Sequence, residues 1–365
     1  TLKNNGNTYL SVDTNDVVTM NVASLNGGQL AGNRNVIING DFNIWQRGTS
    51  FAAPADVAYS ADRWCSRNNT AAVFTISRST DVPTVAEAGS LFNYSLLLDC
   101  TTADASVAAG DWVTIEQRVE GFNWLAVAQK ICTLSFWVKA TKTGIYCASL
   151  RSSTGDRSCV VEFTINSTAT WEYKTITFPA SPSGGTWDYT TGKGVHIDIA
   201  LMNGTTRQTT AGAWQTGNFV STSNQVNAMD NTANDFRICG VQLEEGSVAT
   251  PFEHRGYGTE LALCQRYFQK MISPPLRGLV TSDTRASYMA MPLSPTMRAA
   301  PTAAFAGTLN FADGTNTGNY SSTHASTLAA DRVQFNFSLT AGFTHLNPAV
   351  LLASGSGTMS LSAEL

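Results

Sequence analysis

The sequence is short of charge. Only 14% of its 365 residues are Asp, Glu, Lys or Arg, against roughly 25% in an ordinary soluble domain. The formal net charge is −4 and no run of Lys and Arg occurs. Nucleic-acid phosphates are neutralised by clustered cations, so the sequence predicts no nucleic-acid partner.

Long apolar runs are also missing. No window approaches the ~18 consecutive apolar residues of a membrane span, and residues 1–6 contain no apolar core of a signal peptide. We therefore expect no membrane insertion. Because the chain does not start with Met, we expect it to begin inside a longer protein.

The cysteines do not form the patterns that are typical of metal sites or disulfide-bonded domains. The seven cysteines are an odd number and form no C-x-x-C pair, which argues against both a zinc site and a disulfide framework. Cys132, Cys147 and Cys239 lie inside apolar strand patterns. There we expect each to be a small buried hydrophobe.

Catalytic signatures are absent. There are four histidines and no nucleophile elbow, H-E-x-x-H helix, P-loop or dinucleotide fingerprint. A pair of carboxylates would suffice for a glycosidase, but a chain with 27 acidic residues offers such pairs by chance. We predict no enzyme and no catalytic residue. The candidate carboxylates are Asp41, Asp62, Glu116, Glu120 and Asp198, of which Glu116 and Glu120 are expected on a solvated surface.

The sequence is rich in Thr, Ser, Asn and Gly, and within it apolar and polar residues alternate in several segments. Val195, Ile197, Ile199 and Leu201 alternate with polar residues, and Leu134, Phe136 and Val138 do the same. This period predicts half-buried strands. About eight to ten of them between residues 35 and 256 predict an all-β jelly-roll sandwich. The stretches 35–48 and 236–253 are predicted to be its first and last strands, closing against each other.

Three further segments flank this domain. Residues 1–34 hold short polar strands that need partners to bury a core, with a Gly-rich linker near residues 26–32. Residues 257–273 are predicted as a linking helix that starts at Thr259 and ends before Pro274. Residues 274–365 are predicted as a C-terminal β-sandwich tip domain, because Val333, Phe335, Phe337 and Leu339 alternate.

Eight tryptophans are many for so polar a chain. Indole and phenol rings stack on sugar rings, and nearby amides and carboxylates bond hydroxyls. Trp187, Asp188, Tyr189 and Trp214 follow loop-like sequence and are the candidate ligand-binding residues. Trp45, Trp64 and Trp137 lie in strand patterns and are expected in the core.

A structural calcium is the one metal to consider. Asp41, Glu244 and Glu245 lie in the turns beside the first and last strands, and calcium prefers such oxygen ligands. The alternative is that Asp41 bonds backbone amides in an Asx-turn. We favour the turn and assign no metal site.

Several of these motifs occur in one order that resembles a known family. They are Val36–Phe42 with Trp45–Gly48, Tyr59–Trp64, Cys132–Ala140, Gly240–Glu253, Glu260–Phe268, Met297–Thr302 and Ala363–Leu365. The set resembles phage tail fibres, receptor-binding proteins with a carbohydrate-binding-module-like jelly roll. The resemblance covers about residues 35–365.

The resemblance implies a virion protein that is made in the host cytoplasm and attaches the phage to its host. The partners implied are two further copies of the chain in a homotrimer, other tail proteins, and a host surface polysaccharide or lipopolysaccharide. A non-enzymatic adhesin is the first interpretation. A tail connector or decoration without glycan affinity and a polysaccharide depolymerase remain the alternatives.

Overall fold

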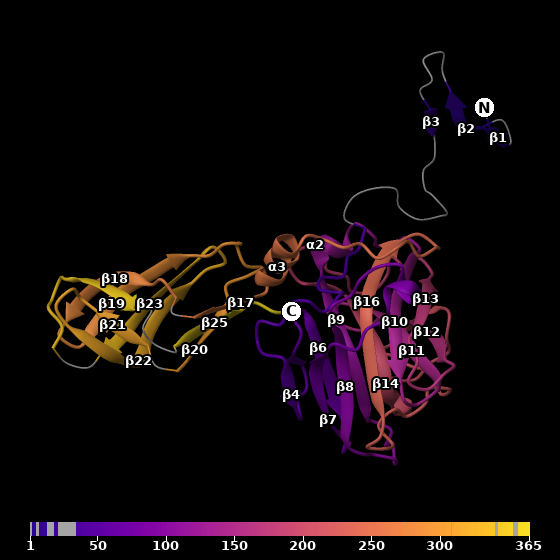
Figure 1. Ribbon diagram of the computed structural model, residues 1–365, viewed down its shortest axis with the longest axis horizontal. Helices are drawn as coiled ribbons and strands as arrows, with labels where there is room; N and C mark the ends of the chain where they lie inside the picture. The colour runs from indigo at the N-terminus through magenta and orange to yellow at the C-terminus, as the bar shows by residue number, and fades with distance from the viewer. Residues whose placement is uncertain are drawn as a thin grey trace.

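Two packed antiparallel sheets form the larger part of the molecule (Figure 1). The computed structural model describes residues 2–4, 7–12, 18–20, 34–272, 274–307, 309–339, 342–352 and 357–365. One sheet has six strands in the order β13 (Glu172–Phe178), β10 (Cys132–Ala140), β16 (Asp235–Glu245), β8 (Ser95–Thr102), β7 (Val73–Ser79) and β4 (Ser50–Ala52). The other has seven, in the order β15 (Trp214–Thr216), β12 (Arg157–Ile165), β11 (Gly144–Ser152), β14 (Lys193–Asn203), β9 (Trp112–Glu120), β6 (Trp64–Asn69) and β5 (Ala58–Tyr59).

The strands exceed the predicted eight to ten because β4, β5 and β15 are edge strands of only two or three residues. The all-β jelly-roll sandwich that the alternation predicts is confirmed.

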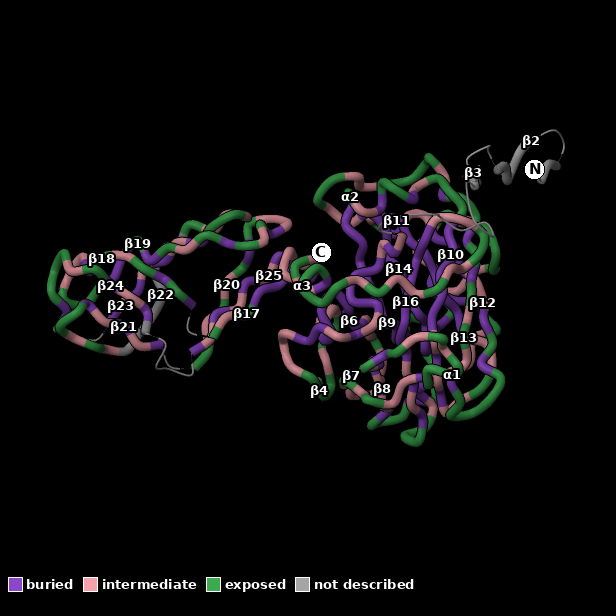
Figure 2. The backbone as a smooth tube through the Cα atoms, turned by 45° about the horizontal axis from the view of Figure 1, so that its top comes forward, coloured by how far each residue is buried: buried purple, intermediate pink, exposed green. Residues whose placement is uncertain are grey.

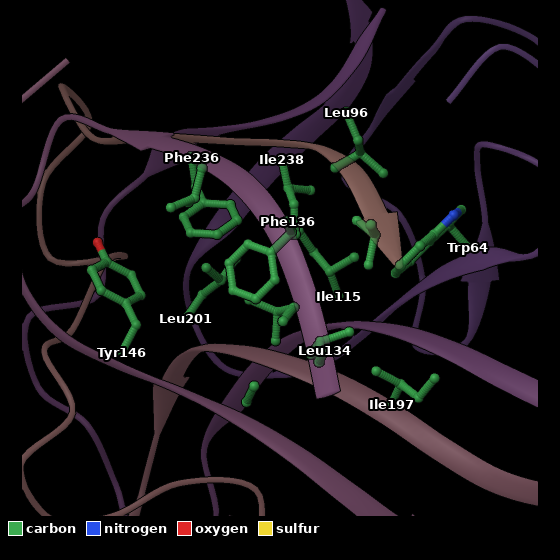
Figure 3. Close-up of a cluster of buried hydrophobic side chains, with 14 of the residues drawn as sticks. Trp64, Leu96, Ile115, Leu134, Phe136, Tyr146, Ile197, Leu201, Phe236 and Ile238 are labelled. Atoms are coloured by element: carbon green, nitrogen blue, oxygen red, sulfur yellow. The ribbon is translucent and has the colours of Figure 1, made fainter. Parts of the chain in front are cut away.

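The alternating residues fill the space between the two sheets. Leu134, Phe136, Ile197 and Leu201 are all 0% exposed, and Figure 3 shows them converging with Phe236 and other buried side chains. Figure 2 shows the same pattern along the backbone, with buried strands inside and exposed loops at their ends. Burying each such side chain contributes about 1.5–3 kcal/mol. All seven cysteines are buried and free, as expected of small hydrophobes.

Residues 35–48 lie against β16 as predicted, but they are not a regular strand. Val36 N donates to Leu243 O at 3.0 Å and Val241 N to Gly40 O at 2.9 Å. Between these bonds the Asn35 side chain replaces the ladder, donating to Val241 O and accepting from Leu243 N, both at 3.1 Å. Gly40 is required because a Cβ there would lie 2.1 Å from Val241 O. The prediction of a first strand is wrong, while the predicted contact is confirmed.

The linking helix is shorter than the predicted 257–273. Helix α3 runs from Tyr257 to Gln265 with Gly256, not Thr259, at its N-cap. Strand β17 (Phe268–Ile272) follows and pairs along its whole length with β25 (Thr358–Ser362). The local spacing of apolar residues predicted a helix, but pairing with a strand some 90 residues later decides the conformation. Ser273 lies outside the described residues.

The C-terminal part is a closed barrel, where a second sandwich was expected. Its strands are β18 (Arg277–Ser282), β19 (Arg285–Pro292), β23 (Arg332–Leu339), β22 (Thr317–Leu328), β21 (Asn310–Ala312) and β24 (Pro348–Leu352). A smaller sheet, β17-β25-β20 with β20 at Thr302–Ala306, connects it to α3. Val333, Phe335, Phe337 and Leu339 are buried as predicted. Alternation of apolar and polar residues shows only that one face of a strand is buried. Strands of a barrel and of a sandwich have the same alternation, so this pattern does not distinguish the two folds.

The last residues of the chain reach back to the sandwich. The Glu364 carboxylate pairs with Arg63 and, at 2.9 Å, with Arg47. Tyr59 donates to Leu365 O at 3.0 Å. The Arg47 guanidinium also lies 3.6 Å from the centre of the Phe268 ring. These contacts tie the β17-β25-β20 sheet to the sandwich.

The N-terminal part contributes a three-stranded antiparallel sheet of β1 (Leu2–Asn4), β2 (Asn7–Val12) and β3 (Val18–Met20). The predicted linker near residues 26–32 lies outside the described residues. The other helical segments are α1 (Val85–Ala88), α2 (Gly121–Trp124) and a 3-10 turn at Thr205–Arg207. No helix in the described ranges has the length and apolar character needed to cross a membrane.

Candidate functional site

The structure brings two of the predicted ligand-binding residues together. Trp187, in the loop between β13 and β14, stacks on Trp124 with ring centres 5.8 Å apart. The Trp214 ring meets Trp187 edge-on at 5.6 Å. Trp187, Tyr189 and Trp214 are all half-buried and packed against the main core. The rings form a packed cluster at the side of the sandwich.

Most polar groups of this cluster are bonded within the protein, although the buried Trp124 indole N–H has no partner among the described residues. The Trp187 indole donates to Gly184 O at 3.3 Å and the Trp214 indole to Pro179 O at 2.9 Å. The Asp188 carboxylate accepts from Thr190 N at 2.7 Å and from Gly192 N at 3.1 Å. Desolvation would raise the pKa of Asp188, but the Thr190 and Gly192 bonds outweigh it and lower the pKa. Asp188 therefore holds its own turn.

A more open aromatic site lies on the outer face of the six-stranded sheet. A pocket of about 330 Å³ is lined by Trp137 and Tyr173 on one side and by Phe92 and Phe252 on another. Trp137 of β10 and Tyr173 of β13 are cross-strand partners with ring centres 5.2 Å apart. Tyr173 is 43% exposed. We call this cavity the Trp137 pocket.

The floor of the Trp137 pocket depends on a glycine. Gly240 in β16 has φ +61°, and a Cβ there would lie 2.8 Å from the Phe92 ring. The register between β10 and β16 shifts opposite this point, between Ser135 and Trp137. Such a bulge in a strand re-aims the neighbouring side chains. Here it leaves room for rings above the sheet.

Hydroxyl and carboxylate groups surround the rings. Ser90, Ser135, Thr250 and Glu87 line the Trp137 pocket. Glu87 belongs to α1, where its carboxylate accepts from Thr84 N at 2.7 Å in a capping box. That backbone hydrogen bond lowers the pKa of Glu87. The pocket thus combines stacking surfaces with a negative, hydrogen-bonding rim.

Sequence reasoning missed this pocket because it assigned Trp137 to the core. Trp45 and Trp64 are in the core as expected, 9% and 0% exposed, but Trp137 is half-buried and faces outward. The signal was present. Trp137 alternates with Phe136 and Val138 and shares its face with Ser135 and Lys139. The glycine within β16 was a second signal, since glycine inside a strand marks a bulge or a close approach.

The outer face of the seven-stranded sheet carries a buried ionic network instead. Its members are 0–7% exposed, and we call this set the ionic face: Glu116, Arg118, Arg151, His196 and Asp198. Arg151 bonds Asp198 at 2.7 Å and Glu116 at 2.6 Å, and Arg118 bonds Glu116 at 2.5 Å. His196 Nδ1 lies 3.3 Å from Glu116.

Four of the five candidate carboxylates pair with arginines: Asp62 with Arg47 at 3.2 Å, Glu116 and Asp198 with Arg151, and Glu120 with Arg266. The expectation that Glu116 and Glu120 are solvated is wrong: they are 0% and 1% exposed. Glu120 accepts from Arg266 and Tyr267, and its position between α3 and the sandwich explains its burial. Desolvation would raise the pKa of Glu116, but His196, Arg151 and Arg118 together hold it well below its ordinary value.

The Asp41 region has the geometry of a turn. Asp41 Oδ1 accepts from Asn43 N at 3.4 Å and Oδ2 from the Asn43 amide at 2.5 Å. Glu244 accepts from Thr250 N at 2.8 Å, and Glu245 pairs with Lys130 at 2.7 Å. Within the described residues, no three His, Cys, Asp or Glu side chains gather as a metal-binding group.

Comparison with known proteins gives distant structural likenesses. No protein-family model and no curated protein sequence matches the chain. The enzymatically active domain of tailspike protein 4 of bacteriophage CBA120 is 14% identical with a TM-score of 0.32, covering 58% of this chain and 21% of that one. This chain thus matches about a fifth of that protein's length.

Two carbohydrate-binding domains are similarly distant. The family 11 carbohydrate-binding module of a cellulosomal cellulase of Clostridium thermocellum is 13% identical with a TM-score of 0.29, covering 56% of this chain and 98% of that one. The N-terminal cellulose-binding domain of a Cellulomonas fimi glucanase is also 13% identical, with a TM-score of 0.29. The match covers 56% of this chain and 97% of that one. TM-scores this low do not carry the assignment, which rests on the two sheets described above.

Proposed function

We propose that the chain is a tail-fibre protein of a virion and attaches a phage to a glycan on its host as a non-enzymatic adhesin. The observation that carries this proposal is the Trp137 pocket, where two ring faces meet a rim of hydroxyls. The order of sequence motifs shared with phage tail fibres supports the virion setting.

The pocket suits a sugar for a physical reason. A sugar ring has apolar C–H faces and a polar edge, so it needs stacking surfaces and hydrogen-bonding groups side by side. Trp137 and Tyr173 supply the stacking surfaces, and Ser90 and Glu87 lie at the rim. The Tyr173 ring is partly exposed to solvent, and a bound sugar would cover it.

Assembly as a homotrimer belongs to the same proposal. The strands of the β1-β2-β3 sheet are only three, six and three residues long, and three-fold association with other copies and with further tail proteins would stabilise so small a sheet. Light scattering of the full chain at micromolar concentration tests this. We expect the mass of three 39.0 kDa chains, and a monomer would contradict it.

A tail connector without glycan affinity is the second candidate. The observation that favours it is the set of Glu364 and Leu365 contacts that ties the β17-β25-β20 sheet to the sandwich. A depolymerase is less favoured, because Glu116 and Asp198 are buried and bonded to Arg151. A glycosidase needs two carboxylates that reach its substrate.

A glycan array with the purified full chain distinguishes these candidates. An adhesin binds a defined subset of bacterial surface glycans, whereas a connector binds none. Incubation with the bound polysaccharide, followed by an assay for new reducing ends, tests for a depolymerase. Release of products would overturn the non-enzymatic assignment.

A further inference from the structure

A second cavity lies beside the Trp137 pocket. It measures about 410 Å³, and Arg78, Asn93, Tyr94 and His254 are among its lining residues. The segments 87–94 and 249–257 contribute to both cavities. We call the second one the Arg78 cavity.

A wall of three rings separates the two cavities. Phe92 and Phe252 line the Trp137 pocket, and His254 lines the Arg78 cavity. The three rings contact one another, with centres 5.3 Å apart for Phe92–Phe252, 5.5 Å for Phe92–His254 and 4.9 Å for Phe252–His254. The two cavities are therefore lined by members of one aromatic cluster.

Most of the charged groups in the Arg78 cavity are already bonded. Arg255 donates to Ile37 O at 3.0 Å and pairs with Glu260 at 3.1 Å. Asp41 accepts from Asn43. Arg78 differs: within the described ranges its guanidinium forms no hydrogen bond or ion pair with another residue. It lies 4.3 Å from the centre of the Tyr94 ring.

The Arg78–Tyr94 pair has the composition of a sugar subsite. Tyr94 offers a ring, and the exposed guanidinium above it offers N–H donors that are free to bond hydroxyl, carboxylate or phosphate oxygens. Asn93 adds an exposed amide at the same edge. This subsite complements the Trp137 pocket, whose rings provide mainly stacking.

We propose that the two cavities form one bipartite site for an oligosaccharide, which crosses the Phe92–Phe252–His254 wall with one sugar unit in each cavity. The proposal rests on the glycan-binding function proposed above and adds the length of the ligand. The Trp137 pocket offers the Trp137 and Tyr173 rings, and the Arg78 cavity offers the Tyr94 ring with the Arg78 guanidinium. A single sugar unit therefore gains only part of the contact area that a chain of two or more gains.

The test is the dependence of affinity on glycan length. Each surface-glycan repeat that binds on the array is measured by titration calorimetry as its monosaccharide, disaccharide and tetrasaccharide. The full chain is compared with Trp137→Ala, Tyr94→Ala and Arg78→Ala. Tyr288→Ala is the matched control, because Tyr288 is 60% exposed on the barrel. Thermal melting checks that every variant folds.

We expect the tetrasaccharide to bind at least tenfold more tightly than the monosaccharide, a difference of about 1.4 kcal/mol. Tyr94→Ala and Arg78→Ala should each weaken tetrasaccharide binding about tenfold and leave monosaccharide binding within twofold. Trp137→Ala should weaken both. Tyr288→Ala should change neither.

Other results overturn specific parts. Equal affinity for all lengths, or Tyr94→Ala acting equally on monosaccharide and tetrasaccharide, refutes the bipartite site while a loss in Trp137→Ala leaves the glycan-binding function standing. Wild-type affinity in Trp137→Ala, with a loss in Tyr94→Ala, removes the Trp137 pocket from the site. Absence of binding to any glycan contradicts both proposals.

Discussion

The two outer faces of the sandwich carry polar and aromatic side chains in different ways. On the seven-stranded sheet, the ionic face is 0–7% exposed and its charges are bonded to one another. On the six-stranded sheet, Trp137 and Tyr173 stand above the strands beside a cavity of about 330 Å³. The first arrangement pairs its charges within the protein. The second leaves ring surface beside a cavity, although the Thr250 hydroxyl donates to Glu244 at 2.7 Å and the Glu87 carboxylate caps α1.

The comparison shows why residue type alone does not identify a site. Charged residues at 0% exposure, such as Glu116 and Asp198, contribute to folding only while every partner is present. The packed cluster of Trp124, Trp187 and Trp214 resembles the ionic face in part, because the indole donors of Trp187 and Trp214 are bonded within the protein. Binding is expected where the groups are positioned but uncommitted.

The largest expected effect comes from breaking the ionic face at its centre. Arg151→Ala leaves Glu116 and Asp198 buried without their shared partner. We expect a loss of about 3–5 kcal/mol in the free energy of unfolding, measured by chemical denaturation. Arg332→Ala is the control, since Arg332 is 67% exposed in its pair with Asp331 and should change stability by less than about 0.5 kcal/mol. Equal effects would refute the structural role of the ionic face.

The packed tryptophan cluster should respond in stability and not in binding. Trp187→Ala removes a ring that stacks on Trp124 and contacts Trp214. We expect a loss of about 2–3 kcal/mol, because the ring is only half-buried. Glycan affinity of the folded variant should match the wild type. A tenfold loss of affinity would contradict this expectation and support Trp187 as a ligand-binding residue.

A smaller change tests how the Trp137 pocket is built. Gly240→Ala introduces a Cβ at φ +61° and 2.8 Å from the Phe92 ring. We expect a cost of about 1–2 kcal/mol from the backbone conformation and weaker glycan binding as Phe92 is displaced. Gly184→Ala is the matched control, because a Cβ there has nothing within 4 Å. If both variants behave alike, the bulge does not shape the pocket.

Acid should affect the ionic face. The pKa of Glu116 lies below its ordinary value of 4.5, so its contribution to stability is present above that pH and is lost as the pH falls through the lowered pKa. Below pH 4.5 the wild type should lose stability more steeply than Glu116→Gln. The difference is at most about 1.4 kcal/mol per pH unit, measured by denaturation at several pH values. Parallel curves would contradict it.

Strand patterns were predictable from the sequence because alternation directly reports burial. Leu134, Phe136, Val195 and Ile197 face the core as predicted. The end of α3 at Gln265 was not predictable from the local sequence, because β17 is a strand through its pairing with residues 358–362. Closure of the C-terminal barrel was not predicted for the same reason, because it depends on pairing between strands that are far apart in the sequence.

The sequence predicted aromatic rings beside polar groups, and the structure adds a second such place at the Trp137 pocket. Aromatic residues near hydroxyls indicated a sugar site, and Trp187 and Trp214 do lie together. Local sequence could not show that their donors are satisfied by Gly184 and Pro179. The burial of Glu116 likewise depends on Arg151, from another strand.

We propose above that the Trp137 pocket binds glycan. The most direct measurement is titration calorimetry of the wild type, Trp137→Ala and Tyr173→Ala against the glycan that binds most tightly on the array. If the pocket binds glycan, each folded variant should lose at least tenfold in affinity, about 1.4 kcal/mol or more, and Tyr288→Ala should bind as the wild type does. Wild-type affinity in both pocket variants would contradict it.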